Sequence, residues 1–356
     1  MAGKFIEGVK PLQQFMEDGS FLMPEIPAVF RALQAMGAPE YVDYDCLLSL
    51  SGMAVRLAWL PGWPAHSHQG VFHSGDSLDT VKLALDRAGA KYTVREIADI
   101  GLDAAISEIK ASIDRGMPVL TRVCGGMAVL GYRDDDLYGV GTFADRKKRV
   151  PPHGYNKVEG IKSYILFDAY EPRPVDAPLL LDTLRTAVHL ARVTHIDSLG
   201  DAALGIASFD AVAEMMVWDE SFEPLERGKR CEGELSFPYE RPAGYWREDG
   251  ARTLGERFWA GYCDYLCMLN GYENFARFLE TYADLLPEWA GRLKQAAAYY
   301  RVACHYSGEL WKYVTPNDKG VWKFRKKEVR YAFAAHMLRA KIYTVKAVEI
   351  LEQVIG

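Results

Sequence analysis

The sequence predicts an α+β protein, because helical and extended hydrophobic periods both occur and fall in different parts of the chain. The chain has 356 residues, 49% hydrophobic and 25% charged, which is the usage of a globular protein with a large core. Extended patterns lie between residues 118 and 170, and only helical patterns follow residue 178. We therefore predict a mixed domain over residues 1–177 and an all-helical subdomain over residues 178–356.

The mixed domain begins with predicted helices. Apolar residues recur every three or four positions from Asp45 to Trp59, which predicts one helix. Gly52 lies inside it and indicates that another backbone approaches closely there. Two more helices are predicted over Leu78 to Ala88 and over Leu102 to Arg115, each followed by a glycine.

Extended segments follow Pro118, and together they predict an antiparallel sheet. They are rich in Val, Ile, Tyr and Leu, and Gly or Asp clusters bound them. Arg133 to Asp136 reads as a hairpin turn. The segments are VLTRVCGG from Val119, MAVLGYRDDDLYGVG from Met127 and SYILFDAY from Ser163.

The second half carries apolar stripes at helical spacing. The segment at about 222–250 is the longest connection, which predicts an exposed loop or a flap. The predicted helices are Pro178 to Thr194, Ala202 to Trp218, Thr253 to Leu269, Tyr272 to Leu285, Pro287 to Val314 and Lys326 to Ile355.

Charge and composition narrow the classes of partner. The net charge is −6 and no broad basic stripe occurs, so we expect no nucleic-acid partner. No segment reads as a secretory leader or as about 20 uninterrupted apolar residues, so we expect a cytoplasmic protein without a membrane partner. The six cysteines are scattered, and we expect them to be reduced. The sequence leaves the oligomeric state open, a homo-oligomer included.

Four segments of the chain carry a recognisable combination of motifs. They are SLSGMAVRLAW from Ser49, GMPVLTRVCGGMAVLGYRDD from Gly116, ILFDAYEPRP from Ile165 and AAAYYRVACHYSGELW from Ala296. Together they resemble a bacterial family related to the N-terminal domain of the butirosin-biosynthesis protein H. The resemblance implies a papain-like fold in the mixed domain, with an architecture like that of cysteine proteases or acyltransferases.

Papain-like chemistry needs a thiolate at the start of a helix and a histidine on the first returning strand. The resemblance places the nucleophile helix at Phe21 to Gly37, which contains no cysteine, and the histidine position at Gly125. Asp145 lies at about the spacing of the carboxylate that orients the histidine, but without an imidazole it orients nothing. The resemblance therefore implies that the catalytic pair is missing.

Two cysteines are weak candidates for a relocated nucleophile. Cys46 lies near the start of a predicted helix but beside Asp45, and a buried structural thiol is the more frequent use of such a residue. Cys124 ends a predicted strand at the place of the missing histidine, although no nearby group would activate it.

The loop PGWPAHSHQGVFH holds the densest group of histidines, His66, His68 and His73. They are weak candidates for a metal site, because zinc or iron needs three or four such ligands and loop histidines are commonly solvated. We expect no bound metal and no cofactor.

Arg56 interrupts an apolar segment, so it is expected either to be paired or to line a wet cavity. Under the second interpretation Arg56, Trp59, Trp63, Cys124 and Tyr132 form a ligand-binding wall.

Three functional hypotheses follow. The first is a catalytically vacant papain-like protein that binds a small molecule or peptide-like metabolite in a cleft between the sheet and the helices. The second is an acyltransferase or amide hydrolase that uses Cys124 or Cys46, and the third is a metal-dependent enzyme that uses the histidine loop. The missing cysteine and histidine favour the first.

Overall fold

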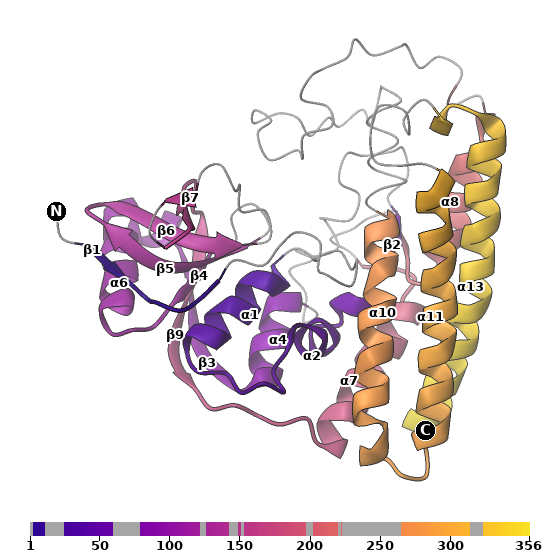
Figure 1. Ribbon diagram of the computed structural model, residues 1–356, viewed down its shortest axis with the longest axis horizontal. Coiled ribbons are helices and arrows are strands. Elements are labelled where there is room, and N and C mark those ends of the chain that lie inside the picture. The colour runs from indigo at the N-terminus through magenta and orange to yellow at the C-terminus, as the bar shows by residue number, and fades with distance from the viewer. Residues whose placement is uncertain are drawn as a thin grey trace. The chain divides into compact units, whose positions relative to one another are not determined.

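The computed structural model describes residues 3–10, 25–59, 79–121, 126–141, 149–150, 153–196, 202–219, 222, 265–313 and 323–356. They fall into two compact units, one within residues 1–51 and 81–174 and the other within residues 52–80 and 175–356 (Figure 1). The first unit contains an antiparallel sheet and helices, and the second is mostly helical, which confirms the predicted α+β class. Residues 52–80 group with the helical unit. The predicted single boundary at residue 177 assigns them to the mixed domain instead.

One antiparallel sheet organises the first unit. Its strands lie in the order β3-β9-β4-β5-β6-β8-β7, and β1 also pairs with β5. The strands described are β1 (Gly3–Phe5), β3 (Ala90–Glu96), β4 (Val119–Thr121), β5 (Met127–Arg133), β6 (Asp136–Gly141), β7 (Arg149–Val150), β8 (Tyr155–Val158) and β9 (Ser163–Tyr170). The helices described are α1 (Ile26–Ala35), α2 (Tyr44–Leu50), α4 (Thr80–Ala88), α5 (Ile97–Ile100) and α6 (Leu102–Asp114).

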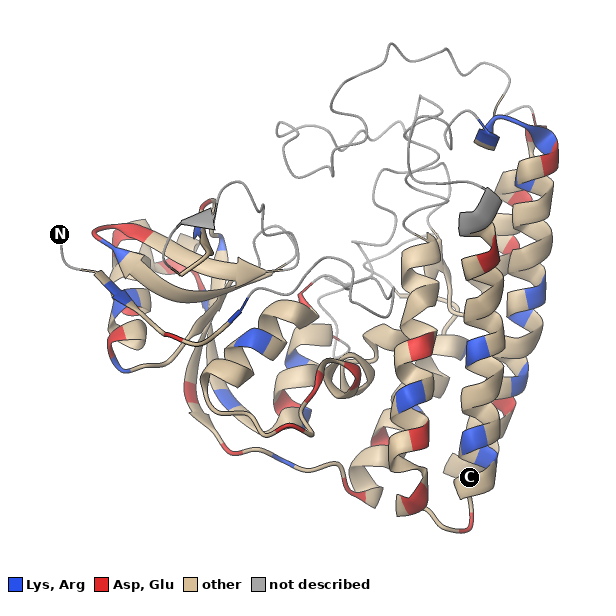
Figure 2. Ribbon diagram, in the orientation of Figure 1, with Lys and Arg blue, Asp and Glu red and all other residues tan. Residues whose placement is uncertain are grey.

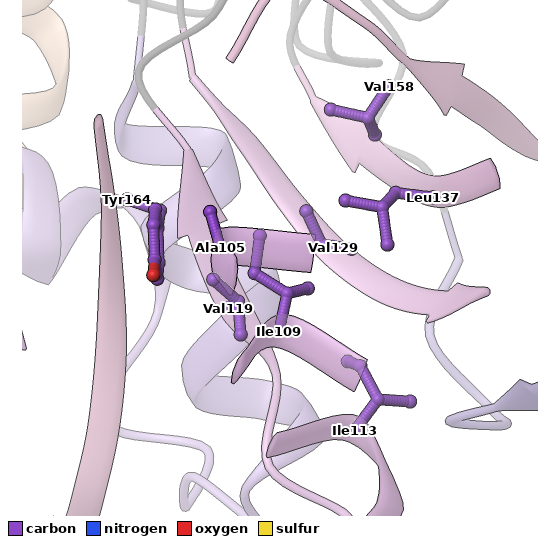
Figure 3. Packing of buried hydrophobic residues seen from close by; sticks show 8 residues of the cluster. All are labelled: Ala105, Ile109, Ile113, Val119, Val129, Leu137, Val158 and Tyr164. Carbon is purple, nitrogen blue, oxygen red and sulfur yellow. The ribbon is translucent and has the colours of Figure 1, made fainter. Parts of the chain in front are cut away.

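Helix α6 packs against the sheet through three fully buried residues spaced four apart, Ala105, Ile109 and Ile113. This spacing places them on one face of a helix. Tyr164 closes the cluster, and its hydroxyl donates a hydrogen bond of 2.7 Å to Glu108 Oε2. The remaining members of the cluster drawn in Figure 3 come from strands β4, β5, β6 and β8 and are Val119, Val129, Leu137 and Val158.

Several predicted elements of the first unit are confirmed. Helices α4 and α6 end where glycines were expected to stop them, with Gly89 at φ +89° and Gly116 at φ +78°. Strands β5 and β6 form the predicted hairpin, in which Arg133 pairs with Asp136. Asp134 takes a left-handed φ of 52° in the turn, a conformation that Asp adopts more readily than most residues.

The single helix predicted over Asp45 to Trp59 is wrong. Helix α2 stops at Leu50, and Gly52 turns the chain at φ +73°. A short 3-10 helix, η1 (Met53–Val55), and strand β2 (Ala58–Trp59) follow. The group that approaches Gly52 is also not a backbone, since a Cβ there would lie 2.8 Å from Leu190 Cδ1.

The second unit contains the long helices. Besides η1 and β2, its described elements are α7 (Ala177–Arg192), β10 (Ala203–Leu204), α8 (Ala207–Val217), α10 (Tyr265–Tyr282), η7 (Ala283–Leu285), α11 (Ala290–Tyr313) and α13 (Lys327–Ile355). Helices α7, α11 and α13 confirm three of the predicted helices. None of the described helices combines the length and apolar character that crossing a membrane requires.

Helix α10 is continuous where the sequence predicted a break between Leu269 and Tyr272. Gly271 lies at this point, and a Cβ on it would be 2.5 Å from the carbonyl oxygen of Ala54. The glycine therefore allows close contact with residue 54 rather than ending a helix. The residues between Phe222 and Tyr265, which hold the predicted long connection, lie outside the described residues.

Asp219 joins the end of α8 to the start of α13. Its carboxylate accepts hydrogen bonds from Lys327 at 2.7 Å, Tyr331 at 2.8 Å and the buried guanidinium of Arg330 at 2.5 Å. Hydrogen bonds from Lys327, Tyr331 and Arg330 lower the pKa of Asp219 to about 2. Figure 2 shows Lys and Arg residues gathered at the start of α13. The arrangement ties the two helices together.

Candidate functional site

An unusual backbone conformation lies where α1 begins. Glu25 precedes the helix with φ 69° and ψ −43°, near the rare and strained geometry of a classic γ-turn. Its carbonyl accepts from the N–H groups of Ala28 and Val29 at 3.0 and 3.1 Å, so it starts the helical ladder. The residue is 2% exposed, and both carboxylate oxygens are buried. A carboxylate in such a position must be paired, hydrogen-bonded or protonated.

Gly126, just before β5, packs directly against Glu25. A Cβ on Gly126 would lie 2.9 Å from Glu25 Cα and 3.2 Å from its Cβ. Gly126 also has a left-handed φ of +86°, which glycine adopts without steric cost. These two residues form what we call the α1–β5 corner.

Packing of α1 on the sheet holds this corner in place. The helix buries Ile26, Ala28, Val29, Ala32 and Leu33 and contacts β4, β5 and β6. Because these residues follow a helical period, one side of α1 faces the sheet. The start of α1 and the start of β5 are therefore fixed relative to each other within one packed core.

The corner places a carboxylate at a helix N-terminus, where the macrodipole favours negative charge. Neither of its two residues carries a thiol or an imidazole. A carboxylate can accept hydrogen bonds or offset a cation, but it cannot act as a sulfur nucleophile.

Two of the three thiols in the described residues, Cys46 and Cys304, are in unreactive surroundings. Cys46 is buried in α2, where its N–H donates to Asp43 Oδ1 at 2.7 Å in an N-cap. Burial raises the pKa of Cys304 to about 11. A thiol with a raised pKa has little thiolate at neutral pH and reacts slowly.

Two of the predicted wall residues lie inside the second unit. Arg56 is 2% exposed, and Trp59 is fully buried on β2. Trp59 makes an edge contact with Tyr265 at 6.0 Å between ring centroids, and the Tyr265 hydroxyl lies 2.7 Å from Ser208 Oγ. The surroundings of Trp59 are those of a packed core, and ligand binding by Arg56 and Trp59 stays a prediction.

Tyr132 lies in the first unit, on β5, with its hydroxyl engaged. It donates to Asp114 Oδ1 at 2.8 Å, and Lys110 Nζ lies 5.5 Å from its ring centroid. Lys110 in turn pairs with Asp135 at 2.7 Å. These contacts fasten α6 to the β5–β6 hairpin, which gives Tyr132 a structural role.

The other predicted site residues lie outside the described residues. They are Trp63, His66, His68, His73, Cys124 and Asp145. Within the part of the chain that the structure does describe, no three His, Cys, Asp or Glu side chains are grouped as a metal ion would require.

Sequence reasoning missed Glu25 and Gly126 as a pair. A positive φ at Glu cannot be read from a sequence, because Glu rarely adopts this conformation. The available signals are the acidic residue just before the helix IPAVFRALQA and the glycine pair before β5.

No protein-family model matches the sequence, and no curated protein matches it.

Proposed function

We propose that this chain is a papain-like protein, related to the family of the butirosin-biosynthesis protein H N-terminal domain, that lacks thiol catalysis. In this proposal it binds a small molecule or a peptide-like metabolite at the α1–β5 corner. The observation that carries the proposal is the contact between Glu25, at the start of α1, and Gly126. Helix α1 packs on the antiparallel sheet.

The chemistry of that corner supports the proposed absence of thiol catalysis. Thiol catalysis joins a cysteine at a helix N-terminus to a histidine within hydrogen-bond reach. If α1 is the counterpart of the nucleophile helix, Glu25 stands at its start. Gly126 then follows the residue expected to replace the histidine, Gly125. A carboxylate and a glycine cannot form the thiolate–imidazolium pair.

The strained backbone of Glu25 favours a role in binding. A non-glycine residue in a sparsely populated region costs about 1 to 3 kcal/mol, and such residues cluster at ligand sites. Glu25 combines this conformation with a buried carboxylate. A ligand with an amino group or another hydrogen-bond donor is the chemical complement of that group.

Native mass spectrometry of the purified chain tests the proposal. We expect the native mass to exceed the mass of the chain by that of a small molecule bound to some or all of the chains. Denaturation should release this molecule for identification. Glu25→Gln should lose the adduct, whereas Asp99→Asn, which changes an exposed carboxylate on α5, should keep it. Circular dichroism confirms that both variants are folded.

Two results contradict the proposal. One is an adduct that both variants retain, which would place binding away from the α1–β5 corner. The other is acyl-transfer or amidase activity that Cys46→Ser or Cys124→Ser abolishes, because this outcome would establish a relocated nucleophile.

A further inference from the structure

Helix α13 carries an exposed apolar stripe along the face opposite its buried one. Tyr331, Leu338 and Ile342 are 45%, 43% and 54% exposed, and Ala335 between them is also exposed. We call these four residues the outer stripe. Their spacings of four, three and four residues match the a and d positions of a heptad repeat.

The outer stripe is separate from the surface that holds α13 in the unit. The helix packs against α7, α8 and α11 (Figure 1), and its inward residues repeat with the ordinary helical period. These buried residues include Phe333, Met337, Ala340, Thr344, Ala347, Val348 and Leu351. Single exposed apolar residues are normal, but large ones aligned at heptad spacing are typical of a surface for another helix.

Cations flank the outer stripe on both sides. Arg339 and Lys346 lie along one edge, and in the described residues neither forms an ion pair with a carboxylate. Lys346 lies over the rings of Tyr299 and Tyr343, 5.7 and 5.2 Å from their centroids. Lys341 lies along the other edge and pairs with Asp210 at 2.5 Å. Edge positions of this kind select the charge of a partner helix.

We infer that the outer stripe is a docking site for one amphipathic helix of another protein, whose apolar seam is flanked by acidic residues. The apolar residues would meet Leu338 and Ile342, and the carboxylates would lie against Arg339 and Lys346. A second copy of α13 is the poorer match, because it would bring its own Arg339 and Lys346 to the same edge. Like charges placed together disfavour pairing.

Two synthetic helical peptides test this inference on the full chain. Each has about three heptads with Leu at positions a and d, and one carries Glu and the other Lys at positions e and g. With a fluorescent label, anisotropy should report binding of the Glu peptide at least about tenfold tighter than binding of the Lys peptide. Leu338→Ser combined with Ile342→Ser should weaken the Glu peptide at least about tenfold.

Matched variants separate the outer stripe from general stickiness. Leu102→Ser removes a leucine of the first unit that is at least as exposed as Leu338 and Ile342, and it should leave binding unchanged. Arg339→Gln combined with Lys346→Gln should reduce the preference for the Glu peptide to less than about threefold.

Three results would overturn the inference. In the first, neither peptide binds, which would mean that the chain itself covers the outer stripe. In the second, both peptides bind equally. In the third, sedimentation equilibrium finds a dimer that the Leu338→Ser and Ile342→Ser changes dissociate, which assigns the outer stripe to a second copy.

Discussion

Gly126 lies so close to Glu25 that a single added methyl group would contact the glutamate backbone at 2.9 Å. The glutamate is held at φ 69° and the glycine at φ +86°, so both residues at this contact have left-handed backbones. Since α1 and β5 meet there, the contact fixes the local geometry on which the proposed function depends.

Gly126→Ala should destabilise the first unit more than an ordinary left-handed glycine does. The control is Gly116→Ala, where φ is +78° and nothing lies within 4 Å of the new Cβ. In the control, backbone strain alone should lower the free energy of unfolding by about 1 to 2 kcal/mol. Gly126→Ala should lower the free energy of unfolding by at least about 1 kcal/mol more, because the glutamate backbone must move. Urea unfolding measures both, and equal losses would mean that the contact is not tight.

Glu25→Gly and Glu25→Ala form a second matched pair. Both remove the carboxylate, but only glycine relieves the backbone at φ 69°. The free energy of unfolding should be about 1 kcal/mol higher for Glu25→Gly than for Glu25→Ala. If thermal and urea unfolding place the alanine variant level with or above the glycine variant, Glu25 is not strained.

Gly271→Ala should disrupt the packing of α10, although alanine is the better helix former. The new Cβ would lie 2.5 Å from Ala54 O, and the backbone would have to shift, at a cost of about 1 to 3 kcal/mol. Gly308→Ala in α11 meets nothing within 4 Å and should instead stabilise the chain by up to about 1 kcal/mol. Opposite signs in the two melting-temperature shifts are the expected result; stabilisation in both would refute the packing argument.

Asp219 should make stability depend on acid pH. Its pKa in the folded chain is about 2, below the unfolded value of about 3.9. A carboxyl group with a lowered folded pKa contributes stability above the unfolded value and loses it as pH falls through the folded value. Asp219→Asn should therefore unfold in less urea than the parent at pH 7, with a gap that narrows from about pH 4 towards pH 2. The exposed Asp99→Asn is the control, and a gap independent of pH would contradict the assignment.

Much of the fold could be predicted because its elements have strong local signals. Helix α6 combines a four-residue apolar spacing with a glycine stop, and the β5–β6 hairpin has an aspartate turn between apolar strands. Tertiary contact overrode local pattern elsewhere. Gly271 suggests a helix break in the sequence, yet it lies inside α10. A glycine is needed there because the backbone at Ala54 approaches it closely.

The candidate site was less accessible to sequence reasoning. Arg56 stands out in the sequence as a charge in an apolar segment, and it is buried in the structure. Glu25 gives no comparable signal, since its importance comes from a backbone conformation and from a contact with a residue about 100 positions away. Pairwise contacts of this kind are a property of the folded chain.

The rate at which each of the six cysteines is alkylated at neutral pH tests the central claim most directly. Peptide mass spectrometry after brief treatment with iodoacetamide gives the six rates separately. If thiol catalysis is absent, no cysteine should react faster than a free thiol with its ordinary pKa. Buried Cys46 and half-buried Cys304, whose pKa is raised, should react more slowly. Stoichiometric labelling of Cys124 or Cys46 well ahead of the other thiols would contradict the account.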